Sequence, residues 1–71
     1  MNLTGANLNF ANLSFVGLDG ANLTDANLSS ANLQHSYLNE ANLNRADLSY
    51  ADLRNAHFPD AVLTDADLGG A

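Results

Sequence analysis

Apolar residues return at every fifth position along the whole chain. Leucine is the repeated residue and phenylalanine replaces it once, in the set Leu3, Leu8, Leu13, Leu18, Leu23, Leu28, Leu33, Leu38, Leu43, Leu48, Leu53, Phe58, Leu63 and Leu68. On an α-helix, five residues turn the chain by about 500°, so each leucine would lie about 140° from the last. In a flat strand, an odd spacing sends alternate leucines to opposite faces. Neither element explains the pattern.

A backbone that bends once in every repeat does explain it. Alanine lies two residues before most of the apolar positions, Asn or Asp usually lies directly before them, and the two positions after them are mostly small or polar. Asn, Asp, Ser and Gly tolerate turn conformations. With one bend per repeat, every leucine and alanine can point to a common axis. The whole chain is then one internal repeat, and we expect a single domain over residues 1–71.

The exceptions to the repeat predict how many bends make one coil. The Asx position is interrupted at Val62 and, at intervals of twenty residues, at Gly17, Tyr37 and His57. Val16 and Ser36 replace alanine and are also twenty residues apart. A coil of four pentapeptides stacks these exceptions on one face, whereas a three-sided coil scatters them. The sequence therefore predicts a square coil of twenty residues and about three and a half coils, with a length of about 17 Å at roughly 4.8 Å per coil.

The repeated A-N/D-L-x-x unit resembles the pentapeptide-repeat family over essentially the full chain. This resemblance implies an all-β fold, the right-handed quadrilateral β-helix. In that family the central Leu or Phe and the Ala two residues before it point inward, and the other three positions point outward. Many members, which are abundant in cyanobacteria, have no known activity. The resemblance implies a solenoid that serves as a non-catalytic scaffold or protein–protein interaction module.

The charge of the chain restricts its partners. The formal net charge is −6, and Arg45 and Arg54 are the only cationic side chains. Direct binding to nucleic acid or to an anionic membrane is therefore not expected. Most carboxylates fall in the C-terminal half and predict an acidic face made of Glu40, Asp47, Asp52, Asp60, Asp65 and Asp67.

An acidic surface could instead dock on a basic DNA-binding surface. Some members of the resembled family resemble duplex DNA in shape and charge and act on DNA gyrase. The alternative function is thus an acidic DNA mimic that acts on gyrase or on another DNA-binding protein. Those members are longer and dimeric, and many outward Asx positions here are neutral asparagine.

The sequence predicts no enzyme, no cofactor and no metal site. Cysteine is absent, and His35 and His57 lack the spacing and the third ligand of a zinc site. Stacking by twenty residues would bring Glu40 near Asp60, but on a convex polar surface such a pair is expected to be solvated rather than to perform acid–base chemistry. Weak binding of Ca²⁺ or Mg²⁺ there is the less favoured alternative.

Outward aromatic residues give the most specific indication of a contact site. The candidates for partner or dimer contact are Phe10, Phe15, Tyr37, Tyr50 and His57. Exposed phenylalanines close together are unusual on a soluble surface. The alternative is that each ring lies flat over its neighbour in the next coil, and the sequence does not decide between the two.

The two ends of the coil raise the question of self-assembly. No capping helix can be fitted at either end, and an uncapped coil presents unpaired backbone groups. End-to-end stacking into a homodimer is one expectation, with the end near Phe10 and Phe15 slightly favoured, and a fragment of a longer protein is the other. No signal peptide or long apolar run is present in the chain as given, which predicts a cytoplasmic location.

Overall fold

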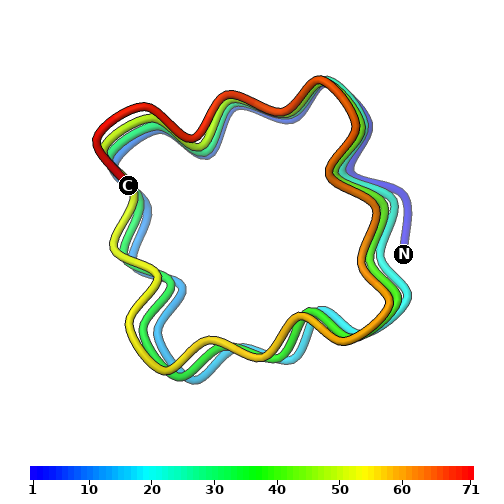
Figure 1. Ribbon diagram of the computed structural model, residues 1–71, viewed down its shortest axis with the longest axis horizontal. Helices are drawn as coiled ribbons and strands as arrows, with labels where there is room; N and C mark the ends of the chain where they lie inside the picture. The colour runs from blue at the N-terminus through cyan, green and yellow to red at the C-terminus, as the bar shows by residue number, and fades with distance from the viewer.

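The computed structural model describes residues 1–71, which wind into a coil with a square outline (Figure 1). The chain contains no helix, and it alternates single extended residues with turns of two residues. Ten parallel bridges join residues twenty apart in the sequence, from Asn2–Asn22 to Asp47–Asp67. Seen along the coil axis, the trace runs anticlockwise as it approaches the viewer, so the coil is right-handed. The four-sided, twenty-residue register expected from the exceptions in the sequence is confirmed.

A turn closes every repeat. In the first turn the amide of Ala6 donates to the carbonyl oxygen of Leu3 at 3.0 Å, and the same bond recurs along the chain. The second turn residue adopts a positive φ throughout, between 57° and 64° for the eleven residues that are not glycine. A positive φ at this position is the geometry of a type II turn. This reversal every five residues brings all the leucines to one axis.

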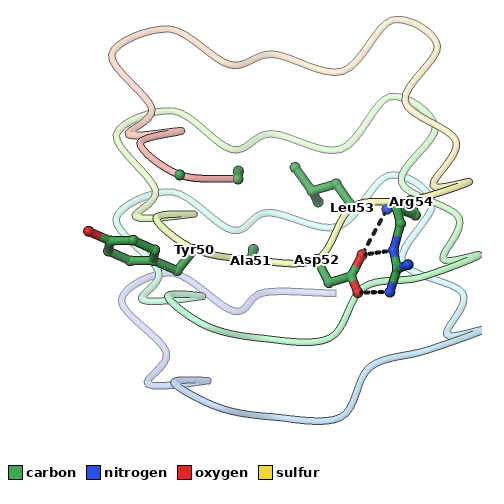
Figure 2. Close-up of a pocket in the computed structure, with 7 residues that line it drawn as sticks. Tyr50, Ala51, Asp52, Leu53 and Arg54 are labelled. Atoms are coloured by element: carbon green, nitrogen blue, oxygen red, sulfur yellow. Dashed lines mark hydrogen bonds and ion pairs between the residues drawn. The ribbon is translucent and has the colours of Figure 1, made fainter.

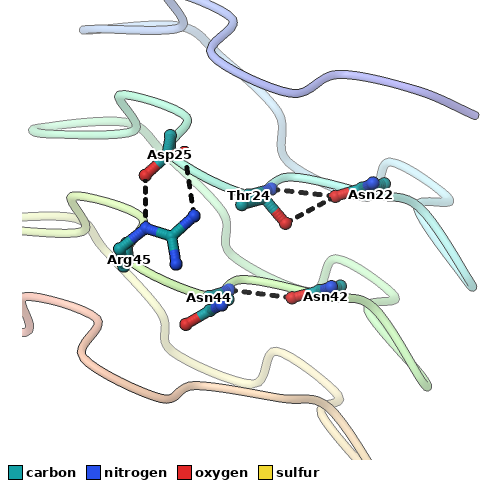
Figure 3. Close-up of polar contacts among 6 residues, drawn as sticks. All are labelled: Asn22, Thr24, Asp25, Asn42, Asn44 and Arg45. Atoms are coloured by element: carbon teal, nitrogen blue, oxygen red, sulfur yellow. Dashed lines mark hydrogen bonds and ion pairs between the residues drawn. The ribbon is translucent and has the colours of Figure 1, made fainter.

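Asparagine precedes the leucine because its side chain holds the turn that follows. Oδ1 of Asn22 accepts hydrogen bonds from the backbone amide of Thr24 at 3.1 Å and from its hydroxyl at 2.7 Å (Figure 3). Asn42 accepts from the amide of Asn44 in the same way, one coil further on. These bonds are Asx turns, which Asn and Asp form more readily than other residues.

Backbone hydrogen bonds join each coil to the next on all four sides. The amide of Leu3 donates to the carbonyl oxygen of Asn22 at 2.7 Å, and the amide of Asn22 donates back to Met1 at 2.9 Å. The turns also pair, since the amide of Gly5 donates to Thr24 at 2.8 Å. The stack therefore has the hydrogen bonding of a parallel sheet, although every extended segment is one residue long.

The buried core lies in the middle of the stack. Leucine and alanine side chains from Leu18 to Ala51 fill the axis, together with the buried Ser36. The end coils are less covered: Leu3, Leu8 and Leu13 are half-buried, and Leu63 and Leu68 are exposed. The Cα trace measures 20 × 20 × 17 Å, so the molecule is a short square block rather than a long rod. No helix could cross a membrane.

Candidate interaction surface

The register of twenty residues sorts the outward side chains onto two regions of the block. Residues 10–17, 30–37 and 50–57 lie above one another and form what we call the aromatic face. Residues 18–27, 38–47 and 58–67 form what we call the acidic side. The exposed phenylalanine and tyrosine side chains are all on the aromatic face, and charged groups dominate the acidic side.

Two aromatic pairs on the aromatic face are stacked between neighbouring coils. Phe15 stacks against His35 of the next coil with ring centroids 4.7 Å apart and planes at 8°. Tyr37 stacks against His57 at 5.0 Å, also at 8°. Both Phe15 and Tyr37 nevertheless remain exposed. Stacking between coils, one of the two alternatives left open by the sequence, therefore occurs, and each ring still leaves much of its surface in solvent.

Phe10 and Tyr50 lie at one corner of the aromatic face, and Phe15 and His35 lie at the next corner along the chain. Their exposed fractions are 75% and 74%. The ring of Tyr50 lies against the backbone of Gly70 in the next coil, where an added Cβ would come within 2.7 Å of the ring carbon Cδ1. Gly70 thus leaves room for the ring, which is held in place from one side.

The aromatic face contains one pair of charges, and they neutralise each other. Arg54 donates from Nε to Oδ1 of Asp52 at 2.9 Å and from Nη2 to Oδ2 at 2.7 Å (Figure 2). Gln34 also donates to Oδ2 of Asp52, at 2.8 Å. The hydrogen bond from Arg54 is the main reason that the pKa of Asp52 falls to about 2. This pair was not predicted from the sequence, because it joins residues two apart rather than residues stacked by the register.

The acidic side carries the whole net charge. Arg45 binds Asp25 of the coil below through Nε at 2.8 Å and Nη2 at 3.1 Å (Figure 3), and this pair lowers the pKa of Asp25. Asp65 occupies the same turn position in the coil above but makes no ion pair with Arg45. The carboxylates without a cationic partner are Asp19, Glu40, Asp47, Asp60, Asp65 and Asp67.

The structure corrects the predicted acidic face at one residue. Five of the six residues assigned to an acidic face lie together on the acidic side, but Asp52 lies on the aromatic face and is paired with Arg54. Hydrogen bonds from Ser49 lower the pKa of Asp47. Nowhere do three His, Asp or Glu side chains gather closely enough to hold a metal ion.

The one pocket in the structure lies at the last coil. It has a volume of about 520 Å³ and is lined by Tyr50, Ala51, Asp52, Leu53, Arg54, Gly70 and Ala71 (Figure 2). Residues 51–54 form its floor, directly below the position where a further repeat would stack. We assign no ligand to it, because its shape follows from the step of the coil.

Comparison with known proteins agrees with this geometry. The family model described as "Pentapeptide repeats (8 copies)" matches residues 2–45 and 41–71. A crystal structure of the pentapeptide-repeat protein Rfr23 from the cyanobacterium Cyanothece 51142 superposes with a TM-score of 0.73 at 32% identity, over 94% of this chain and 53% of that one. The pentapeptide-repeat protein alr5209 from Nostoc PCC 7120 superposes with a TM-score of 0.53 at 34% identity, over 94% of this chain and 55% of that one.

The chain spans about half the length of these solved relatives. No curated protein matches it. The similarity thus covers the repeat itself and nearly all of the present chain.

Proposed function

Because the chain belongs to the pentapeptide-repeat family, we propose that it is a non-catalytic scaffold that binds another protein through its outward side chains. Members of this family are generally structural or interaction modules rather than enzymes. The axis of the coil is filled by leucine and alanine, so a small-molecule substrate has no interior site to enter. Contact with a partner must then use the outer surface.

The observation that carries this proposal is the exposure of the aromatic face. Phe10, Phe15 and Tyr50 are each at least 69% exposed, yet the backbone beneath them is fixed by hydrogen bonds between coils. Aromatic side chains on a rigid support are the residues that most often dominate protein–protein binding energy. An exposed aromatic group of this kind supports a role in binding another protein.

Affinity capture from an extract of the native cell tests the proposal. The wild type is compared with the Phe10→Ser, Phe15→Ser variant and with Glu40→Gln, Asp60→Asn as a control on the acidic side. We expect a protein, identified by mass spectrometry and reproduced with purified components, that binds the wild type and the control but not the aromatic variant. If no protein binds the wild type in preference to both variants, the proposal is wrong.

We also propose that the chain forms about three and a half coils whose ends pair with a second copy. The amides of Leu53, Phe58, Leu63 and Leu68 donate no backbone hydrogen bond, and Leu68 is exposed. The apolar exposure favours the end that carries the last coil, rather than the end near Phe10 and Phe15. Further repeats of a longer chain would satisfy the same groups.

Sedimentation equilibrium of the 71-residue chain tests the pairing. We expect self-association that a Leu63→Glu, Leu68→Glu variant loses and that Phe10→Ser, Phe15→Ser retains. A wild type that remains monomeric at every concentration would contradict it.

The acidic side supports the second candidate function, a mimic of DNA. Six carboxylates without a cationic partner lie on one part of the surface, and a basic DNA-binding protein would meet them with complementary charge. The test is competition with duplex DNA for purified DNA gyrase. Displacement of DNA by the wild type, and not by Glu40→Gln, Asp60→Asn, is the expected result. Unchanged DNA binding at saturating concentrations of this protein would exclude the role for gyrase.

A further inference from the structure

Resting on the proposed role as an interaction module, we propose that the aromatic face binds a proline-rich segment of a partner in the polyproline II conformation. Four observations lead to this occupant: the height of the face, the supported aromatic rings, the free hydrogen-bond donors and the absence of net charge.

The height of the face matches a short extended peptide. One side of the block measures about 20 by 17 Å between Cα atoms. A polyproline II segment advances about 3.1 Å per residue, so five or six residues match the 17 Å height of the block.

The aromatic rings are already in position to bind. Phe15 is stacked on His35 at 4.7 Å, and Tyr50 lies against Gly70, so each of these rings is supported on one side and exposed on the other. With Phe10 they border the face on both corners. Proline-rich segments dock between aromatic rings of this kind, because the pyrrolidine rings pack on flat aromatic surfaces.

Between the two corners, the side-chain oxygens of Asn12, Asn32 and Asp52 already accept hydrogen bonds, whereas the amide groups of the two asparagines are free to donate. Oδ1 of Asn12 accepts from the amide and the hydroxyl of Ser14, and Oδ1 of Asn32 accepts from the amide of Gln34. Both oxygens of Asp52 accept from side chains of the same face. The Nδ2 groups of Asn12 and Asn32 donate to no protein atom.

A proline-rich segment has the complementary set of groups. Proline has no backbone N–H, and a polyproline II segment has no internal hydrogen bonds, so its carbonyl oxygens are free to accept. An ordinary extended strand would bring N–H groups that compete with the hydrogen bonds already made to Asn12, Asn32 and Asp52. The neutral Asp52–Arg54 pair also means that an uncharged segment docks without leaving an unpaired charge buried.

An NMR titration of the 71-residue protein with a synthetic proline decamer tests the proposal. We expect amide shifts confined to the aromatic face, centred on Asn12, Asn32 and His35, with a Kd between about 10 μM and 1 mM. Binding should change little with salt, because no net charge takes part. A glycine–serine peptide of the same length is the control ligand and should produce no shifts.

Variants then locate the site. Phe10→Ser, Phe15→Ser should weaken binding at least about tenfold, and Tyr50→Ser, on a different coil, should weaken it independently. Glu40→Gln, Asp60→Asn should bind as the wild type does. The proposal is wrong if the decamer causes no shifts, if it shifts residues of the acidic side, or if the control peptide binds equally. If one of these results is obtained while the affinity capture still yields a protein partner, only the proline-rich ligand is ruled out. If the affinity capture yields no partner, the proposed function itself is wrong.

Discussion

The second residue of each turn determines the local conformational cost of this coil. A positive φ costs an L-residue roughly 1–2 kcal/mol, and the chain accepts it at eleven residues that are not glycine. Hydrogen bonds between turns offset the cost, as when the amide of Phe15 donates to the carbonyl oxygen of Gln34 at 2.9 Å. Residues as different as Phe10 and Asp65 can therefore occupy this position with the same backbone conformation.

Gly20 and Gly17 separate the effect of backbone conformation from that of space. Gly20 has a φ of +70°, Gly17 is not in the left-handed region, and an added Cβ would meet nothing within 4 Å at either residue. Gly20→Ala should therefore lower the free energy of unfolding by about 1 kcal/mol. Gly17→Ala should leave it unchanged or raise it by about 0.4–1 kcal/mol. Urea denaturation of the two variants compares them, and an equal loss in both would contradict the assignment of strain to φ.

Ser36 is a polar residue at an inward position. Its side chain is fully buried and Oγ has no hydrogen-bond partner. Ser36→Ala should raise the free energy of unfolding by about 1 kcal/mol, because it removes an unsatisfied buried hydroxyl. The reverse change at a neighbouring inward position, Ala31→Ser, should lower it by a similar amount. Thermal melts of both variants measure the pair, and a destabilised Ser36→Ala protein would show that the hydroxyl has a partner.

The ion pair between Asp52 and Arg54 should make the stability of the folded protein depend on pH in acid. The pKa of Asp52 is about 2 in the folded protein, against 3.8 for the free group, chiefly through the hydrogen bond from Arg54. The stabilisation of the folded protein by ionised Asp52 is therefore complete above pH 3.8 and is lost as the pH falls through about 2.

Arg54→Leu should raise the pKa of Asp52 toward its ordinary value. Carbon-detected NMR titration of the carboxylate measures this directly, with Arg45→Leu as the control that moves Asp25 and leaves Asp52 unchanged. An unaltered Asp52 titration in Arg54→Leu would mean that Gln34 and the backbone, rather than the guanidinium, set the pKa.

At the scale of the coil, the sequence predicts the features that depend on the register, namely the length of the coil and the residues that stack between coils. The intervals of Gly17, Tyr37 and His57 predict the twenty-residue coil, and that coil places Tyr37 against His57. The sequence cannot predict choices that depend on side-chain conformation. Arg54 is the first residue of its turn and binds Asp52 two residues earlier, whereas Arg45 is the second residue of its turn and binds Asp25 in the coil below. Asp65 also stacks on Arg45 by the register but forms no ion pair with it, and the pattern of residue types does not encode that choice.

The position of a leucine in the stack should determine how much it contributes. Leu33 is fully buried in a middle coil, whereas Leu68 in the last coil is 44% exposed. Leu33→Lys should prevent folding, because it places a charge on the apolar axis without a partner. Leu68→Lys should lower stability only modestly, since the ammonium group can reach solvent. Circular dichroism melts compare the two, and a cooperative melt of Leu33→Lys would contradict the inward placement.

At the scale of the whole molecule, the register creates two surfaces of different chemistry from one repeat. The inward positions are nearly uniform, so the same core continues through every coil, and only the outward positions differ from side to side. One side can therefore carry all the uncompensated charge while another stays neutral. A globular chain of this size would need separate elements to hold two such surfaces apart, whereas here stacking alone does it.

The concentration of charge on the acidic side predicts how the protein responds to salt. Glu40 and Asp60 occupy the same turn position in neighbouring coils, which lie about 4.8 Å apart, and neither has a cationic partner. Like charges at this distance repel, and salt screens them over a Debye length of about 10 Å at 0.1 M. Glu40→Gln, Asp60→Asn should therefore raise the melting temperature in dilute buffer, and the gain should disappear at about 1 M salt, where the Debye length is about 3 Å.

Asp52→Asn is the matched control, because it removes a carboxylate that is paired with Arg54 rather than repelled. This variant should melt at a lower temperature than the wild type despite its smaller net charge. If Glu40→Gln, Asp60→Asn were destabilised instead, the two carboxylates would be holding a cation, and addition of Ca²⁺ to the wild type should then raise its melting temperature. If the melting temperature responds neither to Glu40→Gln, Asp60→Asn nor to Ca²⁺, the acidic side is too well solvated for repulsion to matter. Its charge would then act only on association with other molecules.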